Sequence, residues 1–374
     1  MKYIVVGTGV YGSVMAERIA NKLKEKVLII DKRNHIGGNC YSYIDEETGI
    51  ECHKYGSHIF HTSNENVWNY INKFTQFNNY QHHVWTTYKG KVYSLPINLN
   101  TINSYFSKNL SPTEAEEFIK KEANKENLLN PKNLEEKAIS LIGRHLYEAF
   151  IQGYTEKQWE KDPKELSADI ITRLPIRYNY NNRYFSDLYE GIPSEGYTKI
   201  FEKMLDNNLI EIKLNTSFEM IKNQLPKDAF IVYTGPIDQY YNYKFGKLEW
   251  RTVDFEVERY EVADYQGTSV MNYAGAEVPY TRIHEFKHFH PEIKYKDKTI
   301  IYKEFSHKTI NDEPYYPIKT ENNIEILNKY KELAKKEKNI VFGGRLGLYK
   351  YFDIDDAIDD AINVFEDTKF DINK

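Results

Sequence analysis

The chain has 374 residues, of which 50 are Lys or Arg and 55 are Asp or Glu, so its formal net charge is −5. The two signs are interspersed, which leaves no global field for binding nucleic acid or an anionic membrane. A hydrophobic share of 41% over this length is enough for two or three packed domains. The two cysteines, Cys40 and Cys52, form no CxxC motif, so we expect no disulfide framework and a cytoplasmic setting.

The N-terminal stretch IVVGTGVYG has the pattern of a pyrophosphate-binding turn. The apolar run 3–6 is typical of a buried strand, and a GxGxxG set follows it, made of Gly7, Gly9 and Gly12. A helix beginning there would direct free N–H groups at phosphates. The alternatives are a glycine turn that binds nothing and a signal peptide, and the turn spacing argues against the latter.

A second apolar run, 27–30, ends at Asp31, where an acidic side chain suits the hydroxyls of an adenosine ribose. The pair Gly37–Gly38 follows within a few residues. A glycine pair in this place resembles FAD-binding proteins of the glutathione-reductase type, which favours a flavin over a nicotinamide dinucleotide. His58 and His61 are spaced i, i+3, but no third ligand lies nearby, so we expect no metal site.

Between residues 99 and 173 the apolar periodicity is helical, which predicts an inserted helical domain. Ser111-Pro112-Thr113-Glu114 has the features of a helix start, with Pro at the first position. Two more helices are expected at 133–141 and 143–150, ending before the motif GYTEKQW.

After residue 175 the pattern is strand-like at 176–178 and around 184–185. A helix near 198–205 and strands at 210–214 and 230–234 are expected to return to the first domain, and 248–305 has the alternation of antiparallel strands.

The segment HEFKH, 284–288, matches the zinc-protease motif HExxH. That motif requires a helix, whereas this segment alternates like a strand, which would separate its histidines by ~13 Å. We therefore interpret the match as a coincidence.

The C-terminal part predicts a strand, NIVFGG, followed by a helix. The apolar residues of that helix share one face: Ile354, Ala357, Ile358, Ala361, Ile362 and Phe365. Gly343-Gly344 would bring backbone close to a cofactor, so the site is expected to be assembled from both ends of the chain.

Six motifs in this order resemble the prokaryotic UDP-galactopyranose mutases: HKYGSHIFHT (53–62), GYTEKQW (153–159), YTGPIDQYY (233–241), PYTRI (279–283), DEPYYP (312–317) and GGRLGLYKYFD (343–353). Together with the N-terminal unit they cover essentially the whole chain. One departure is Asp31, where the family has Glu. Asp is one methylene shorter, and we expect cofactor binding to survive the change.

The resemblance implies an α/β protein: a Rossmann-like FAD-binding domain with an inserted helical bundle and an inserted antiparallel β-sheet domain. The expected boundaries are 1–78, 195–240 and 312–374 for the FAD domain, 99–172 for the bundle, and 79–98, 173–194 and 241–311 for the sheet domain.

The implied reaction interconverts UDP-galactopyranose and UDP-galactofuranose, the latter for cell-surface glycans. N5 of reduced FAD attacks the anomeric carbon, so the protein supplies no nucleophile of its own. UDP-galactose is the expected substrate, with an unidentified electron donor and a homodimer as further partners. The alternatives are an FAD-dependent oxidoreductase of the amine oxidase or desaturase type and a non-catalytic UDP-sugar-binding protein.

The resemblance also implies roles for individual residues. Arg173 and Arg282 would clamp the diphosphate, since guanidinium groups stay charged and donate in pairs. The catalytic set is Arg173, Arg282, His61, Arg345 and Asp353. The substrate-binding set adds Phe150 and Tyr154 for stacking on uracil, Trp159 on a mobile loop, and the hydroxyls of Tyr184, Tyr316 and Tyr351; Tyr315 is not separated from Tyr316. The cofactor set is Gly7, Gly9, Val10, Gly12, Asp31, Lys32, Gly38, Asn39, His58, Ile59 and Arg345.

Overall fold

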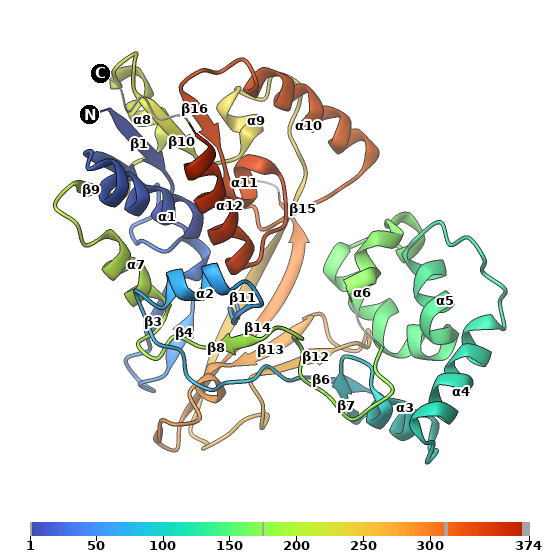
Figure 1. Ribbon diagram of the computed structural model, residues 1–374. Helices are drawn as coiled ribbons and strands as arrows, with labels where there is room; N and C mark the ends of the chain where they lie inside the picture. The colour runs from blue at the N-terminus through green and yellow to red at the C-terminus, as the bar shows by residue number, and fades with distance from the viewer. Residues whose placement is uncertain (1, 174–175, 310–312, 369–374) are drawn as a thin grey trace.

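A five-stranded parallel sheet forms one part of the computed structural model, which describes residues 2–173, 176–309 and 313–368, without the side chains of Asp169, Thr172 and Arg173 (Figure 1). The strand order is β16-β10-β1-β2-β9. The bounds are β1 Tyr3–Val6, β2 Val27–Ile30, β9 Ile210–Lys213, β10 Phe230–Tyr233 and β16 Ile340–Phe342. The strands expected from the apolar runs are therefore confirmed. The chain leaves β1 toward β2 and later returns on its other side as β10, so a switch point lies at β1, where open α/β sheets bind ligands.

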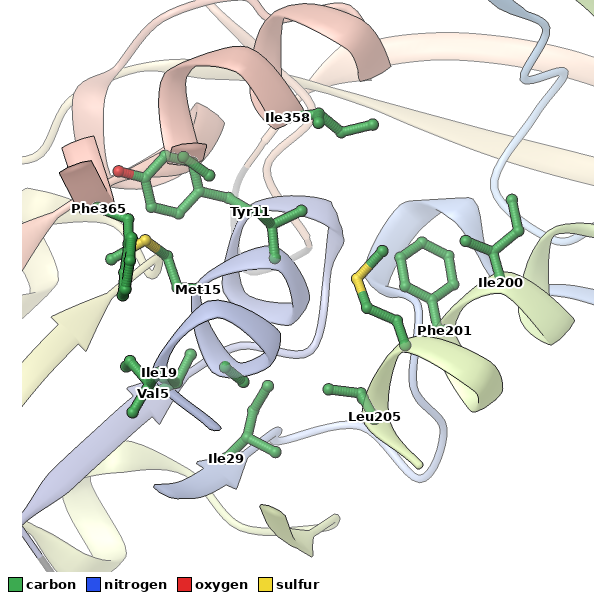
Figure 2. Close-up of a cluster of buried hydrophobic side chains, with 14 of the residues drawn as sticks. Val5, Tyr11, Met15, Ile19, Ile29, Ile200, Phe201, Leu205, Ile358 and Phe365 are labelled. Atoms are coloured by element: carbon green, nitrogen blue, oxygen red, sulfur yellow. The ribbon is translucent and has the colours of Figure 1, made fainter. Parts of the chain in front are cut away.

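Helices cover one face of this sheet and make the largest core. They are α1 (Val10–Arg18), α7 (Tyr197–Leu205) and α12 (Ile354–Asp367), and their apolar side chains gather over Val5 and Ile29 (Figure 2). Ile4, Leu28 and Ile30 alternate to the other face, where Phe218 covers them. The central strands β1 and β2 are thus buried on both faces, which is why they are uniformly apolar, whereas the edge strand β9 is mostly exposed and carries Glu211 and Lys213.

A second sheet of seven strands lies between this part and the helical part (Figure 1). Its order is β15-β11-β14-β13-β12-β6-β7, with β6 Val84–Tyr88, β7 Lys91–Leu95, β11 Trp250–Tyr260, β12 Val270–Tyr273, β13 Arg282–Glu285, β14 Thr299–Lys308 and β15 Tyr316–Pro317. The antiparallel strands predicted within 248–305 are confirmed. The sheet is not wholly antiparallel, because β12 pairs with β6 in parallel.

Helices from residues 99 to 173 pack around a separate apolar core. They are α3 Leu99–Phe106, α4 Pro112–Asn124, α5 Leu134–Tyr147, the π-helical turn η3 Glu148–Gln152, α6 Gly153–Trp159 and the short 3-10 turns η4 Pro163–Glu165 and η5 Ala168–Arg173. The predicted helix start is confirmed: the Ser111 hydroxyl accepts from the Glu114 amide, and the Glu114 carboxylate accepts from the Ser111 amide, as in a capping box. The two helices predicted around Gly143 meet at this residue, whose φ of 77° interrupts the helix.

One further long helix is α10 Glu321–Ala334. The remaining elements are short: η1 Ile19–Leu23, η2 Gly38–Cys40, β3 Ser42–Ile44, β4 Glu51–His53, β5 Phe60–Thr62, α2 Glu65–Ile71, β8 Tyr189–Gly191, α8 Phe218–Ile221, η6 Lys222–Gln224, α9 Ile237–Tyr240, η7 Phe286–Phe289 and α11 Gly344–Leu348. Among the described helices none is long and apolar enough to cross a membrane. The domain boundaries given above stay a prediction.

Two local predictions were wrong. The strand-like stretches at 176–178 and around 184–185 form no strand, and only a single bridge joins the neighbouring Arg183 to His83. Its amides bond across to other segments instead, Arg177 to the Ile97 carbonyl and Tyr184 to the His82 carbonyl. The motif GYTEKQW is also not a loop, because it forms helix α6 and Trp159 is its last residue.

Helix α1 comes very close to the end of strand β1 at Gly12, and this contact gives a stability prediction. A Cβ at Gly12 would lie 1.9 Å from the Gly7 carbonyl oxygen, whereas a Cβ at Gly9 would meet nothing nearer than 3.8 Å. We expect Gly12→Ala to lower the free energy of unfolding by about 3 kcal/mol or more, since backbone must move. Urea unfolding measures this loss, with Gly9→Ala as the control; equal stability of the two variants would contradict the prediction.

Candidate active site

One cleft of about 950 Å³ joins the three parts of the molecule. Its walls come from the carboxyl ends of β1 and β2, from α6 and the helical core, from β13 and β14, and from α11 and the start of α12. Residues from both ends of the chain therefore meet there, as the sequence predicts. Every site residue predicted above lines this cleft except Arg173, whose side chain lies outside the described residues.

The glycine turn at one end of the cleft has the shape of a phosphate cradle. Gly7 has φ of 103°, and Gly38, with φ of 56°, stands so close that a Cβ on it would lie 2.8 Å from the Gly9 Cα. Gly9 is the N-cap residue of helix α1, which therefore has no side-chain cap, and its first turn contains no acidic residue. Its first N–H groups and its dipole are thus open to an anion. These features fit a dinucleotide.

Asp31 closes the other side of this cradle and is largely buried. One carboxylate oxygen accepts hydrogen bonds from the amide and hydroxyl of Thr8, at 2.8 and 2.7 Å, and the other accepts from the Arg33 amide. The shorter Asp is therefore held against the glycine turn itself. Nearby, Lys32 and Arg33 both pair with Glu313, a residue that the sequence analysis did not select.

His61 is held from two sides. Its Nδ1 lies 2.8 Å from the Asp187 carboxylate, and the ring stacks on Phe185 with the centroids 3.7 Å apart. The other carboxylate oxygen of Asp187 accepts from the Ser63 hydroxyl. This leaves the imidazole fixed in orientation on the cleft wall. His58 differs: its Nδ1 lies 2.7 Å from the Gly56 carbonyl, and burial lowers its pKa to about 3, so it stays neutral.

A buried chain of polar groups supports Arg282. Its guanidinium lies 3.0 Å from the Glu304 carboxylate, whose second oxygen lies 3.0 Å from Nε2 of His284. The Nδ1 of His284 is 2.6 Å from the Ser57 hydroxyl. Burial would raise the pKa of Glu304, but Arg282 and His284 lower it to about 2. The Arg282 side chain is 29% exposed and donates to the Tyr154 hydroxyl at 2.5 Å, so its charge is presented to the cleft.

Arg345 is another guanidinium of the cleft, near the start of α11. It donates to the carbonyls of Tyr315 and Phe352, and it lies over the rings of Tyr316 and Tyr351 at 5.6 and 5.1 Å. The two rings stack on each other. Asp353 is the N-cap residue of α12 and lines the same wall.

Tyr316 rather than Tyr315 belongs to this group. The Tyr315 side chain is buried, 4% exposed, and its ring lies 6.2 Å from that of Tyr316. The ring of Tyr316 packs against the Arg345 guanidinium and the Tyr351 ring, and Tyr316 contributes with Glu304 and Tyr154 to raising the pKa of Arg282.

The aromatic residues of the cleft differ in how much face they offer. Phe150 is 3% exposed and meets the rings of Tyr93 and Tyr105 edge-on, within the helical core. Trp159 is partly buried against the same core. Tyr154 is likewise partly buried and lines the cleft, so it offers more surface for a flat base than Phe150 does.

Several residues in or beside the cleft escaped the sequence analysis, and none of them belongs to a recognised motif. Glu304 and His82 line the cleft, and Asp187 holds the cleft residue His61. The partners of Glu304 and Asp187 lie on other strands, His284 on β13 and His61 on β5. The signal that could have found Glu304 is that it is the single acidic residue of β14, a strand whose first half is otherwise mostly apolar. His284 was seen only as part of HEFKH.

The HEFKH segment is a strand only in its first half, since β13 ends at Glu285 and a 3-10 turn follows. His284 and His288 meet different carboxylates, Glu304 and Asp264. The two histidines therefore do not converge on one point.

The sequence comparisons agree with this geometry. The family model described as UDP-galactopyranose mutase matches residues 149–351, and a model of an NAD(P)-binding Rossmann-like domain matches residues 5–74. A probable UDP-galactopyranose mutase of Klebsiella pneumoniae is 44% identical over 97% of this chain and 94% of its own length. The chain belongs to the UDP-galactopyranose mutase family.

Two further relatives add detail. An Escherichia coli protein named dTDP-fucopyranose mutase is 43% identical, over 96% of both chains. The crystal structure of a reduced UDP-galactopyranose mutase has a TM-score of 0.74 at 14% identity, with 98% of this chain and 93% of that chain covered, and shares the fold. The family recognised from the motifs and its three-part fold are thus confirmed. Family and Rossmann-like domain together imply a flavin cofactor, and the oxidoreductase alternative is not favoured.

The glycine cradle gives a prediction that separates folding from cofactor binding. Gly9 has φ of −69°, and a Cβ there would find free space within the protein. We expect Gly9→Ala to fold with a stability within about 1 kcal/mol of wild type, yet to bind the flavin at least ten-fold more weakly, since the methyl occupies the approach of the pyrophosphate. Flavin titration of the apoprotein measures this. Unchanged flavin affinity would show that the cradle holds something else.

Three buried histidines give a pH prediction. Burial lowers the pKa of His53 to about 4 and those of His58 and His82 to about 3. When the pH falls below about 6.5, the pKa of histidine in the unfolded chain, only the unfolded chain gains these protons. Each histidine therefore lowers the free energy of unfolding by about 1.4 kcal/mol for each pH unit that the pH falls. His288 and His290 have raised pKa values, and their contribution is already complete and constant below pH 6.5.

Urea unfolding at pH 7, 6 and 5 tests this, with His53→Asn as the comparison. His53 is buried and lies outside the residues that line the cleft. Between pH 6 and 5 the free energy of unfolding of the variant should fall less steeply than that of wild type, by about 1.4 kcal/mol per pH unit. Parallel slopes for variant and wild type would mean that His53 is protonated in the folded protein.

Proposed function

We propose that this chain interconverts UDP-galactopyranose and UDP-galactofuranose with reduced FAD as cofactor. One observation supports this most: a dinucleotide cradle opens into the same cleft as Arg282, whose charge is held by the buried Glu304. A cleft that must hold two diphosphate groups, one of the cofactor and one of the substrate, needs two anion sites, and these are the two.

The residues of the chain bind and orient. Arg282 and Tyr154 take the substrate diphosphate and base, and Arg173 joins the clamp. Reduced flavin, when bound, supplies the nucleophile for the anomeric carbon. Because Arg282 cannot lose its proton, it stabilises the charge that develops on the leaving diphosphate. Tyr184, Tyr316 and Tyr351 contribute hydroxyls to the same group, and Asp353 contacts the sugar.

The cofactor side is equally part of the proposal. His58, Ile59, His61 and Arg345 lie around the flavin ring, while Val10, Lys32 and Asn39 complete the dinucleotide site next to the glycines. An electron donor that reduces the flavin and a homodimeric assembly belong to the proposed function as well.

A dTDP-sugar is a second candidate substrate and belongs in the same assay. The relative named dTDP-fucopyranose mutase is as similar to this chain as the first UDP-galactopyranose mutase relative, 43% against 44%. A dTDP-sugar has the same diphosphate and a similar flat base, so the clamp suits both. Overall identity therefore does not separate the two substrates.

The deciding assay incubates dithionite-reduced holoenzyme with UDP-galactofuranose and, in parallel, with dTDP-fucofuranose, and follows products by chromatography. Turnover of the first substrate only in the reduced state is the expected result. Preference for the second would move the chain to the other substrate. Absence of turnover with both, or equal turnover by oxidised enzyme, would overturn the mutase proposal.

Arg282 gives the sharpest variant. Arg282→Lys keeps the positive charge beside Glu304 but removes the paired donors, so we expect kcat/KM to fall at least about 100-fold while flavin content stays unchanged. Arg259→Lys is the matched control, because Arg259 also pairs with a buried carboxylate, Asp45, but lies outside the residues lining the cleft. Full activity in Arg282→Lys would remove it from the clamp.

A further inference from the structure

Lys157 lies in helix α6 and places its ammonium in a cage of backbone carbonyls. It donates to the carbonyl oxygens of Tyr273 at 2.6 Å, Gly275 at 2.7 Å and Tyr280 at 3.1 Å, and Val278 adds a fourth acceptor at 3.3 Å. Tyr273 is the last residue of β12, and the other three belong to the turn that joins β12 to β13. Among the described residues no carboxylate lies within ion-pair distance of this lysine. A single cation thus organises a whole turn.

The start of the same helix touches the same turn. A Cβ on Gly153 would lie 2.5 Å from the Ala274 carbonyl oxygen, so only glycine permits this approach. The contact and the carbonyl cage are independent observations, and both join α6 to the turn between β12 and β13.

This attachment also determines how two residues of the cleft, Tyr154 and Arg282, lie relative to each other. Tyr154 and Lys157 are spaced i, i+3 and lie on one side of the helix. Tyr280, whose carbonyl is one of the four acceptors around Lys157, precedes Arg282 by two residues. Arg282 in turn donates to the Tyr154 hydroxyl. The lysine therefore fixes the spacing between the two elements whose side chains meet in the cleft.

Stability alone does not account for a lysine here. Burial lowers the pKa of Lys157 to about 8, with Glu277 acting in the opposite direction. Taking an ammonium out of water is costly, and an apolar chain of similar length would avoid that cost. The C-terminal end of α6 also has anchors of its own: the Gln158 carbonyl accepts from the Ser306 hydroxyl, and Glu160 pairs with Arg251.

We propose that Lys157 is a positioning residue for nucleotide binding, which holds the turn between β12 and β13 on α6 and thereby keeps Tyr154 and Arg282 in register. The inference rests on the proposed function, since it assumes that the nucleotide occupies the Tyr154 and Arg282 end of the cleft. The lysine touches neither substrate nor cofactor in this arrangement. It acts through the two residues that do.

The test measures binding of UDP and of dTDP to oxidised holoenzyme by calorimetry, which requires no turnover. Lys157→Met should weaken binding of the better nucleotide at least about ten-fold, because a charge-assisted hydrogen bond in the site loses its geometry. Flavin content should not change. Lys164→Met is the matched control and should bind within about two-fold of wild type, since the Lys164 side chain is 64% exposed and its nearest carboxylate, on Glu135, is 4.0 Å away.

In steady-state assays of the reduced enzyme, the change should appear mainly in KM, because the reacting groups at the flavin are untouched. Equal nucleotide affinity of Lys157→Met and wild type would overturn the inference. If that variant does not fold, Gly153→Ala decides, since it displaces α6 from the turn without altering the charge: weaker nucleotide binding supports the inference and unchanged binding overturns it. Wild type that binds neither nucleotide would instead refute the proposed function.

Discussion

The contact between Gly12 and the Gly7 carbonyl is the constraint on which the rest of the structure depends. It lets α1 lie directly on β1, so the helix N-terminus and the carboxyl end of the strand open at the same point. The C-terminal segment returns to this place, since Gly343 stands where any Cβ would enter the Tyr11 ring, at 2.1 Å. Both ends of the chain are thereby fitted to one cradle. The other residues of the cleft take their positions relative to this cradle.

Charge placement governs the opposite end of the cleft. Arg282, Glu304 and His284 form a buried chain in which each group is stabilised by the next, and such chains are strong only when every member is satisfied. Because Glu304 lies 3.0 Å from Arg282, the guanidinium cannot turn away from the cleft without leaving a buried carboxylate without its cationic partner. Preorganisation of this kind is what a developing negative charge requires.

Local sequence patterns were sufficient for the elements whose burial repeats along the chain. The strands at 3–6 and 27–30 and the apolar face of α12 follow directly from such repeats. Local patterns were not sufficient where the structure depends on contacts between residues that are distant in sequence. The loop at GYTEKQW was implied by the family resemblance alone, yet the segment is a helix in which Gly153 permits a close approach to the Ala274 carbonyl. Glu304 and Asp187 carry no local signal, because their partners lie more than a hundred residues away or on another strand.

The fold by itself does not choose between a mutase and an oxidoreductase. A protoporphyrinogen oxidase homologue and a putrescine oxidase variant share it, with TM-scores of 0.66 and 0.56 at 12% and 10% identity. What separates the classes is the chemistry of the cleft. A cleft for an amine substrate has no need of a fixed guanidinium, since like charges repel, whereas Arg282 is held by Glu304 and faces Tyr154. The same scaffold is thus directed to an anionic substrate by one buried carboxylate, and the positioning of α6 then decides how well that substrate fits.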